Sequence, residues 1–281
     1  MSGVASVLVR DVLTGPVRPG SVVAAGRAAT YLDVDGRLVA VVAPGGVRLP
    51  CAVVASGDGL PLAAGPDLAV GDGAVHQDGR RVLSVRRWFD PRVHLEAGVD
   101  PAAVARFAAL VLALGRADPL LPAHAAERLA RDLAAGDAWD AAARLLGRGT
   151  GLTPAGDDLV AGALAALRAL GSPAADDLGA AVRALALVAT SRLSAALLEG
   201  ADVGAVVPEA AAVLRALAGA GGLAAATDRL VALGHTSGWH LAVGLLVAVS
   251  HAQGPRRRSG DGIRWESTDC VTGTPVGGGG A

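Results

Sequence analysis

Hydrophobic residues follow two different spacings along the chain, and the change falls near residue 100. Residues 1 to about 95 contain short Val- and Leu-rich runs separated by turn pairs such as Asp35-Gly36, Gly45-Gly46 and Asp78-Gly79. Apolar runs with such turns between them are typical of β-hairpins. The first part is therefore predicted to be β-rich, as a small barrel or a sandwich. Strands are expected within residues 6–13, 21–26, 29–43, 47–56 and 80–88.

From residue 100 onward the apolar spacing becomes helical. A capping residue followed by proline marks a helix start, because proline fits the first helical position. The expected caps are Asp100, Asp137, Thr153 and Ser172, with Pro101, Pro154 and Pro173 as first helical residues. About eight helices fit before residue 253, so the fold class is predicted to be α+β with the strands first.

This pattern divides the chain into three expected parts. Residues 1–97 form a β-rich N-terminal domain, and residues 98–253 form an all-α helical domain that carries two glycine-rich loops. Residues 254–281 have little apolar periodicity and end in glycines, so this tail is expected to be disordered.

Composition and charge exclude several classes of protein. The net charge is −1 and all 25 basic residues are arginines spread along the chain, which predicts no nucleic-acid or anionic-membrane surface. Cys51 and Cys270 lie far apart without other ligands at metal-binding spacing, so neither a disulfide framework nor a zinc site is indicated. No run reaches the roughly 20 apolar residues of a membrane span. A soluble cytoplasmic protein is expected.

The first candidate site is GRGTGLTPAGDDLVAGALAAL, residues 147–167. Its glycines precede an apolar helix, and a helix N-terminus with a glycine-rich loop can bind an anion. The segment lacks the Lys-Ser/Thr of a P-loop and the preceding strand of a dinucleotide-binding fingerprint. A plain turn between helices, in which glycines supply positive φ and Thr153 caps, explains the spacing equally well.

Two carboxylates, Asp157 and Asp158, follow this loop directly. Adjacent side chains point about 100° apart on a helix, so only one can serve the helix N-terminus while the other faces a neighbour. They would repel a bound anion unless an arginine or Mg²⁺ lay between them. Magnesium is a hypothesis for this pair, because oxygen-ligand sites generally need more ligands.

A second glycine-rich loop, residues 234–238 in LGHTSGWHLAVGLL, also precedes an apolar helix. It lacks the spacing of a nucleophile elbow, so Ser237 is expected to be a cap or a ligand donor, with Thr236 as the other candidate cap. His235 is a candidate general acid/base or phosphate donor. His240 fits a core histidine equally well.

Two further groups are candidates for a cavity. Thr190, Ser191 and Ser194 are expected on one helix, where they either line a cavity between the glycine loops or bond back to the preceding turn. Arginines flank Trp88 where strands give way to helices, and they either meet an anion in a cleft or are solvated strand-edge charges. These arginines are Arg86, Arg87 and Arg92.

Taken together, four segments resemble one bacterial family. GRGTGLTPAGDDLVAG resembles its G-x-G-x-G-L-T-P-[SA]-G-D-D hallmark, TSRLSAALLEG its T-x-x-[IL]-S helix, and LGHTSGWHLAVGLL its G-x-[ST]-S-G-[WY] segment; RRWFDPR after a GDG turn is a weaker match. The family, once a domain of unknown function, is associated with the AllH-type subunit of oxamate carbamoyltransferase. The resemblance covers about residues 5–252, and it departs at His240, where Asp is expected in many members.

The resemblance implies a role in allantoin and purine-nitrogen catabolism. The implied reaction is phosphorolysis of oxalurate to oxamate and carbamoyl phosphate, which a carbamate kinase then uses to make ATP. The chain would act with two other carbamoyltransferase subunits, one of them related to the α subunit of succinyl-CoA synthetase, and not alone. The alternative is a non-catalytic scaffold or regulatory subunit of such a complex that binds a small anion.

The residues fit this chemistry, which needs donors for anions and for an oxyanion but no protein nucleophile. A hydrolase using Ser237 and His235 is disfavoured, because no third orienting group is visible. The hypothesis assigns catalytic roles to Asp157, Asp158, His235 and Ser237, with Mg²⁺ at the two aspartates. It assigns binding of phosphate or oxalurate to Gly149, Gly151, Thr153, Gly156, Ser191, Ser194, Thr236 and Gly238.

Overall fold

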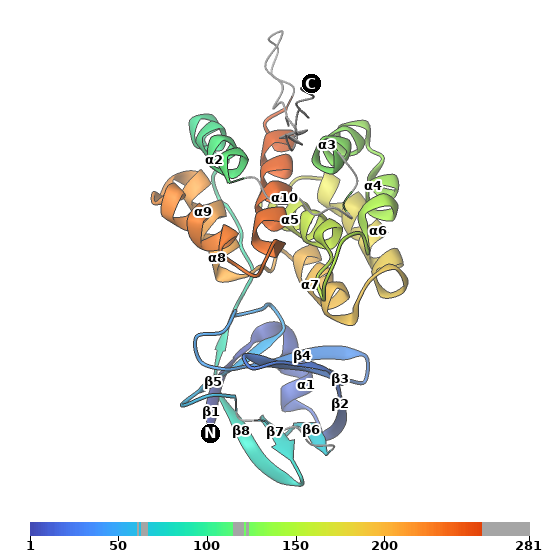
Figure 1. Cartoon of the computed structure of the whole chain (residues 1–281), viewed down its shortest axis with the longest axis vertical. Helices are drawn as coiled ribbons and strands as arrows, with labels where there is room; N and C mark the ends of the chain where they lie inside the picture. Colours follow the sequence, from blue (N-terminus) through green and yellow to red (C-terminus); the bar gives the residue numbers. More distant parts are fainter. Residues whose placement is uncertain (61, 63–66, 115–120, 122–123, 255–281) are drawn as a thin grey trace, which may run out of the picture.

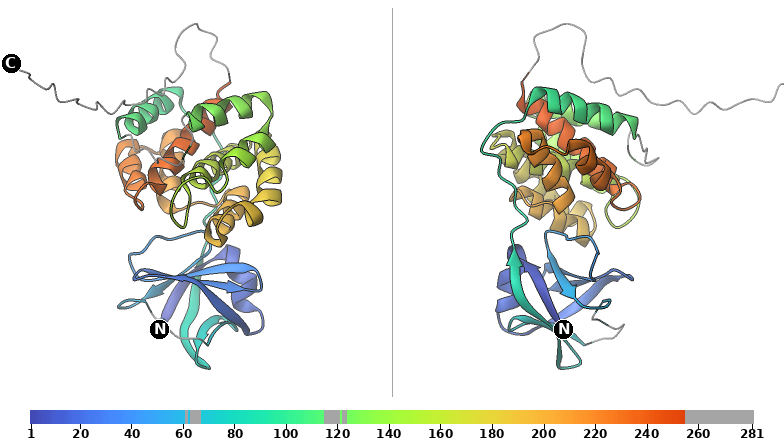
Figure 2. Two further views of the ribbon diagram at one scale, coloured as in Figure 1. Left: turned by 45° about the vertical axis from the view of Figure 1, so that its right-hand side comes forward. Right: turned by 90° about the vertical axis from the view of Figure 1, so that its left-hand side faces the viewer.

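The computed structural model describes the whole chain except residues 61, 63–66, 115–120, 122–123 and 255–281. A β-barrel forms one end of the molecule and a group of helices forms the other (Figure 1). Two further views keep the helices on the same side of the barrel (Figure 2). The α+β prediction with strands first is confirmed. Apart from Gly254, the tail expected to be disordered lies outside the described residues, as does Cys270.

The described residues form eight strands that close into a barrel, which decides between the barrel and the sandwich. The order around the barrel is β1-β5-β4-β3-β2-β6-β7-β8, and β8 returns to pair in parallel with β1. The strands are β1 Ser2–Ser6, β2 Arg18–Ala25, β3 Ala29–Val34, β4 Arg37–Val42, β5 Ala52–Ser56, β6 Leu68–Gly71, β7 Ala74–Gln77 and β8 Arg80–Phe89. Cys51 lies in the barrel core, where burial raises the pKa of its thiol to about 12.

Asp-Gly pairs make three of the hairpin turns. Asp35 and Gly36 both have positive φ and join β3 to β4, which is the backbone of a type I′ turn. The expected turn at 78–79 joins β7 to β8 in the same way, and a turn at 72–73 joins β6 to β7, two strands that the apolar runs did not predict. The hairpin expected at 45–46 is wrong, because β4 and β5 on either side of it are parallel.

The strand expected at residues 6–13 is also wrong. A short 3-10 helix, η1 Val7–Val9, leads into α1 Arg10–Thr14. The Ser6 side chain caps this segment by accepting the backbone N–H of Leu8 at 3.1 Å. The buried residues follow helical spacing, since Val9, Val12 and Leu13 stand at i, i+3 and i+4.

Nine α-helices follow the barrel in the described part of the chain, one more than the estimate. They are α2 Pro101–Ala113, α3 Ala125–Ala135, α4 Ala138–Leu145, α5 Ala155–Ala169, α6 Ala174–Ala189, α7 Arg192–Asp202, α8 Pro208–Arg215, α9 Leu223–Val231 and α10 Ser237–Ala252, with a π-helical segment η2 Ala216–Ala220 after α8. None of the described helices is long and apolar enough to span a bilayer.

The predicted helix starts are mostly within one residue of the observed ones. Asp100 caps α2 through the N–H groups of Ala102 and Ala103. Asp137 stands at the cap position of α4 without a capping hydrogen bond from its side chain. The caps of α5 and α6 were placed one residue early, since Pro154 and Pro173 occupy the cap positions.

Helices α5 and α10 pack against each other in the centre of the helical part (Figure 1). Their backbones approach closely at two glycines. A Cβ on Gly162 would lie 2.3 Å from the Leu241 carbonyl oxygen, and one on Gly244 would lie 2.1 Å from that of Leu159. This close packing holds the N-termini of the two helices side by side.

Helix α7 joins the helical part to the barrel. Leu193 is buried and packs against the apolar cluster of the barrel, and the neighbouring Arg192 forms an ion pair with Asp33 on β3. The chain between the two parts is tied down as well, since the N–H of Val93 donates to the Gly204 carbonyl at 2.9 Å. The barrel and the helices therefore meet along α7.

Candidate functional site

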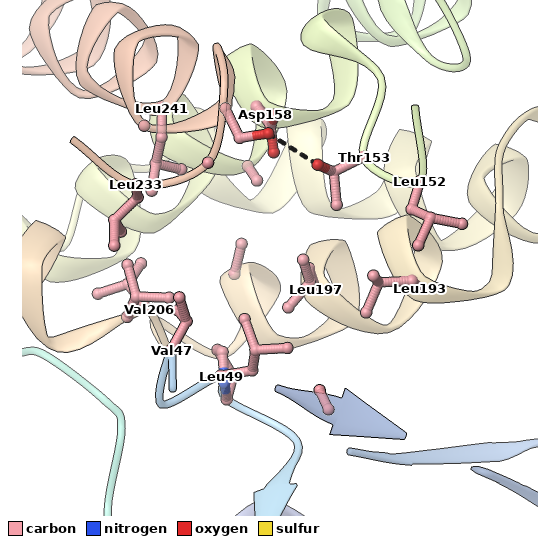
Figure 3. Close-up of a pocket in the computed structure, with 18 of the residues that line it drawn as sticks. Val47, Leu49, Leu152, Thr153, Asp158, Leu193, Leu197, Val206, Leu233 and Leu241 are labelled. Atoms are coloured by element: carbon pink, nitrogen blue, oxygen red, sulfur yellow. Dashed lines mark hydrogen bonds between the residues drawn. The ribbon is translucent and has the colours of Figure 1, made fainter. Parts of the chain in front are cut away.

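A pocket of about 310 Å³ lies between the barrel and the helices. Thr153 and Asp158 stand at the end nearer the helices, and Val47 and Leu49 stand at the end nearer the barrel (Figure 3). Most of the wall is aliphatic. The apolar side chains are Ala28, Ala29, Val42, Val47, Leu49, Pro50, Leu152, Ala161, Leu193, Leu197, Ala201, Ala205, Val206, Val207, Leu233 and Leu241.

The polar end of the pocket comes from the two glycine-rich loops and the helices that follow them. The hydroxyl oxygens of Thr153 and Ser237 lie 2.8 Å apart. Both hydroxyls also hydrogen-bond to the carboxyl of Asp158, in the first turn of α5. Because α10 starts at Ser237, the positive ends of two helix dipoles meet at this point.

Asp158 is buried, with only 8% of its surface exposed. This burial raises the pKa of its carboxyl well above the ordinary value, and the negative charge of Asp157 acts in the same direction. The hydrogen bonds with Ser237 and Thr153 offset part of the shift. Its Oδ2 atom has no hydrogen-bond partner among the described residues. Asp158 thus presents a carboxyl group that holds its proton more tightly than an exposed aspartate.

Asp157 has a different environment, because its side chain points away from the pocket lining. Its carboxylate accepts the backbone N–H of Gly147 at 2.7 Å and the hydroxyl of Thr190. Burial raises the pKa of Asp157 above its ordinary value, and these two hydrogen bonds offset part of that shift. Asp157 therefore ties the glycine loop to the chain between α6 and α7. Adjacent side chains on a helix point in different directions, and here Asp157 contacts Gly147 and Thr190 while Asp158 lines the pocket.

The glycines of the first loop serve close packing of the chain. Gly147 has φ 75°, and a Cβ there would lie 2.1 Å from the Ala189 carbonyl oxygen. A Cβ on Gly156 would lie 2.0 Å from that of Leu145. The N–H groups of Gly156, Asp157 and Asp158 all donate to carbonyls of the chain itself. These contacts support the turn between helices, and they leave the expected binding residues Gly149, Gly151 and Gly156 outside the pocket lining.

In the second loop, Gly234, Ser237 and Gly238 line the pocket, whereas His235 and Thr236 do not. Thr236 stands at the cap position of α10, and its carbonyl accepts the N–H of His240. His235 is exposed. Ser237 is therefore the residue of this loop that brings a polar side chain to the pocket.

His240 lies inside the helical part rather than in the pocket. It is buried, its Nδ1 lies 3.0 Å from the Thr236 carbonyl oxygen, and its ring meets that of Trp239 edge to face at 4.9 Å. These contacts agree with a core histidine.

The expected stripe of hydroxyls on one helix is wrong, because α6 ends at Ala189 and α7 begins at Arg192. Ser191 is extended and caps α7 by accepting the N–H of Ser194 at 3.0 Å. Its hydroxyl donates to the Leu152 carbonyl at 2.6 Å, which fixes the first glycine loop against α7. The hydroxyls thus organise the pocket wall, while Leu193 and Leu197 of the same segment line it.

The arginines at the junction are not among the residues that line the pocket. Arg92 pairs with Asp90 at 2.6 Å, and Arg86 and Arg87 are exposed on β8. The residues that line the pocket include no arginine or lysine, and Asp158 is their only acidic member. The described arrangement therefore agrees with solvated strand-edge charges for Arg86 and Arg87, while Arg92 is paired with Asp90 beyond the end of β8.

A metal at the two aspartates would have few ligands. No group of three His, Cys, Asp or Glu side chains suited to a metal occurs in the part of the chain that the structure describes. Both carboxylate oxygens of Asp157 already accept hydrogen bonds. Magnesium at this pair remains a hypothesis.

Sequence reasoning missed the residues of the pocket that come from the barrel, such as Tyr31, Val47 and Leu49. They look like ordinary strand and loop residues, and nearly a hundred or more positions separate them from the glycine loops. The apolar spacing of Leu193 and Leu197, four residues apart on α7, was the available signal for the helical wall.

Comparison with known families identifies one match. The model of the family described as oxamate carbamoyltransferase subunit AllH matches residues 145–249. The segment runs from the end of α4 into α10 and contains both glycine loops. The recognised resemblance is confirmed for this segment, and the barrel lies outside it. No curated protein and no solved structure matches the chain significantly.

Proposed function

We propose that this chain is a subunit of a carbamoyltransferase complex of the oxamate carbamoyltransferase type. The observation that carries the proposal is the family match over residues 145–249, because this segment supplies all three side chains at the polar end of the pocket. These side chains are Thr153, Asp158 and Ser237. The word subunit in the family description further supports action together with partner chains.

The reaction proposed for the complex is phosphorolysis of oxalurate to oxamate and carbamoyl phosphate. An oxygen of phosphate attacks the carbamoyl carbon, the bond from that carbon to the oxamate nitrogen breaks, and the nitrogen takes up a proton. Such a transfer gains from donors at the developing oxyanion and from an acid near the leaving nitrogen.

Asp158 suits the role of the acid. Its burial favours the protonated carboxyl, which donates a hydrogen bond or a proton, as an ionised carboxylate does not. The hydroxyls of Thr153 and Ser237 beside it supply further donors. In this proposal Asp157 is a positioning residue that holds the glycine loop.

The anionic groups of the substrates need positive charge that the pocket lining supplies only through helix N-termini. No arginine of the part of the chain that the structure describes lines the pocket. Burying a dianion without a paired cation is costly. We therefore propose that phosphate is bound with help from partner subunits and that the chain has little transferase activity alone. His235, exposed at the second loop, remains a candidate phosphate donor.

The second candidate is a non-catalytic subunit that binds a small ligand and helps to assemble the complex. One observation favours it, since the N–H groups of Gly156, Asp157 and Asp158 in the first turn of α5 bond within the chain and are not left for an anion. The two candidates differ in whether pocket substitutions change turnover while the complex stays assembled.

The test is to purify the tagged chain with the subunits that accompany it and to supply oxalurate and phosphate. Carbamoyl phosphate is measured by coupling to a carbamate kinase that makes ATP. The proposal expects product that depends on phosphate and that is lost when this chain is removed from the mixture. Full activity of the partners without the chain would contradict it.

A further inference from the structure

The pocket has one small polar end and a large apolar body. Figure 3 places Asp158 and Thr153 at one end, with Leu193, Leu197 and Val206 along the walls toward the barrel. Oxalurate is polar over its whole length and offers little surface for such walls. A ligand that fills the pocket would bury an apolar group between the barrel and α7.

The charge of the lining also argues against a small dianion. Among the described residues, no basic side chain lines the pocket, and burial raises the pKa of its one acidic side chain, Asp158. Helix N-termini supply only about half a positive charge each. The lining is therefore matched to a ligand whose buried part is uncharged.

Asp158 defines the group at the polar end. Its Oδ2 atom is buried, lacks a partner among the described residues and belongs to a side chain that lines the pocket. A protonated carboxyl offers one O–H donor and one carbonyl acceptor side by side. A carboxamide or urea offers the complementary pair, a carbonyl oxygen and an N–H on the same carbon. The Ser237 hydroxyl beside it can act as donor or acceptor.

We propose that the pocket binds an uncharged carboxamide or monosubstituted urea that carries an apolar group. The amide faces Asp158, Thr153 and Ser237, and the apolar group extends along α7 toward Val47 and Leu49 of the barrel. The proposal concerns binding by this chain and does not need the transfer reaction.

The test is calorimetric titration of the full chain with two matched ligand pairs. Hexanamide and hexanoate share shape and differ in charge, and N-butylurea is compared with oxalurate. The proposal expects hexanamide and butylurea to bind at least tenfold more tightly than their anionic counterparts. Affinity should rise by about fourfold for each methylene from butanamide to hexanamide, as apolar burial requires.

Substitutions then locate the site. Asp158→Asn keeps an uncharged donor and acceptor pair and should bind hexanamide within a few-fold of wild type, whereas Asp158→Ala should lose at least tenfold. Ala161→Leu adds bulk to the pocket wall and should also weaken binding. Asp177→Asn, an exposed carboxylate in the first turn of α6, serves as the control. Circular dichroism and thermal melting establish that each variant is folded.

Two results would overturn the proposal. One is tighter binding of hexanoate or oxalurate than of the amides, and the other is no amide binding by either the isolated chain or its assembled complex. Failure of the transferase assay with persistent amide binding would remove the proposed reaction and leave this inference standing. Turnover of oxalurate without amide binding would support the proposed reaction and overturn this inference.

Discussion

The hydroxyl oxygens of Thr153 and Ser237 lie 2.8 Å apart although 84 residues separate them in the sequence. This contact joins the two glycine-rich loops into one polar surface at the start of α5 and α10. Asp158 completes that surface. The two loops therefore form one end of a single pocket.

Asp157→Asn should destabilise the protein by about 1–3 kcal/mol, the cost of leaving a buried hydrogen-bonding group unsatisfied. The carboxylate accepts both the Gly147 N–H and the Thr190 hydroxyl, and an amide can accept only with its oxygen. Urea denaturation measures the free energy of unfolding of each variant. The exposed Asp177→Asn is the control and should stay within about 0.5 kcal/mol of wild type. An equal effect of both substitutions would contradict the structural role of Asp157.

Stability should depend on pH through Asp158. Burial raises its pKa in the folded state above the unfolded value of about 3.9, so the folded protein holds the proton more tightly. Its stabilising contribution is complete below that unfolded value and is lost as pH rises through the folded pKa. Burial also raises the pKa of Asp157, but Asp157 is present in both wild type and Asp158→Asn. The Asn variant should therefore gain stability relative to wild type from pH 4 to pH 8. A difference that stays constant over this range would show that Asp158 is ionised normally.

Gly162→Ala should destabilise the protein by about 1–3 kcal/mol, because the new methyl would press against the Leu241 carbonyl between α5 and α10. Gly98→Ala is the matched control, since a Cβ there meets nothing within 4 Å. Thermal melting of both variants makes the comparison. Unchanged melting of Gly162→Ala would mean that the two helices can separate without cost.

Two neighbours on α7 should contribute very differently to the contact with the barrel. Leu193→Ala removes a buried side chain that packs against the apolar cluster of the barrel and should cost about 2–5 kcal/mol. Arg192→Ala removes a partly exposed ion pair with Asp33 and should cost less than about 1 kcal/mol. Denaturant unfolding measures the loss of stability in each variant. A larger loss in Arg192→Ala than in Leu193→Ala would contradict this prediction.

Local signals in the sequence predicted much of the fold. Asp-Gly pairs identified two hairpins, and Asp100 with Pro101 identified the start of α2, because these features act through neighbouring backbone. The helical segment within residues 6–13 was predicted as a strand because its three valines favour strands, whereas the cap from Ser6 and the spacing of buried residues decide for a helix. Closure of the barrel depends on pairing between the distant strands β1 and β8, which no local pattern specifies.

The candidate site was predicted only in part. Both glycine loops were singled out, and Asp158 and Ser237 do meet in the pocket. The sequence could not say which of Asp157 and Asp158 faces the pocket, because that depends on the rotation of α5 against its neighbours. Nor could it supply the barrel wall around Val47 and Leu49, which is brought to α7 by tertiary packing.

The most direct test of the account is turnover of the assembled complex carrying Asp158→Ala or Ser237→Ala in this chain. Gel filtration must first show that each variant still co-elutes with its partner subunits. Carbamoyl phosphate formation should fall at least tenfold in each variant, because the acid is lost in one and the neighbouring donor in the other. Full turnover by both assembled variants would contradict it and would leave the chain as a scaffold.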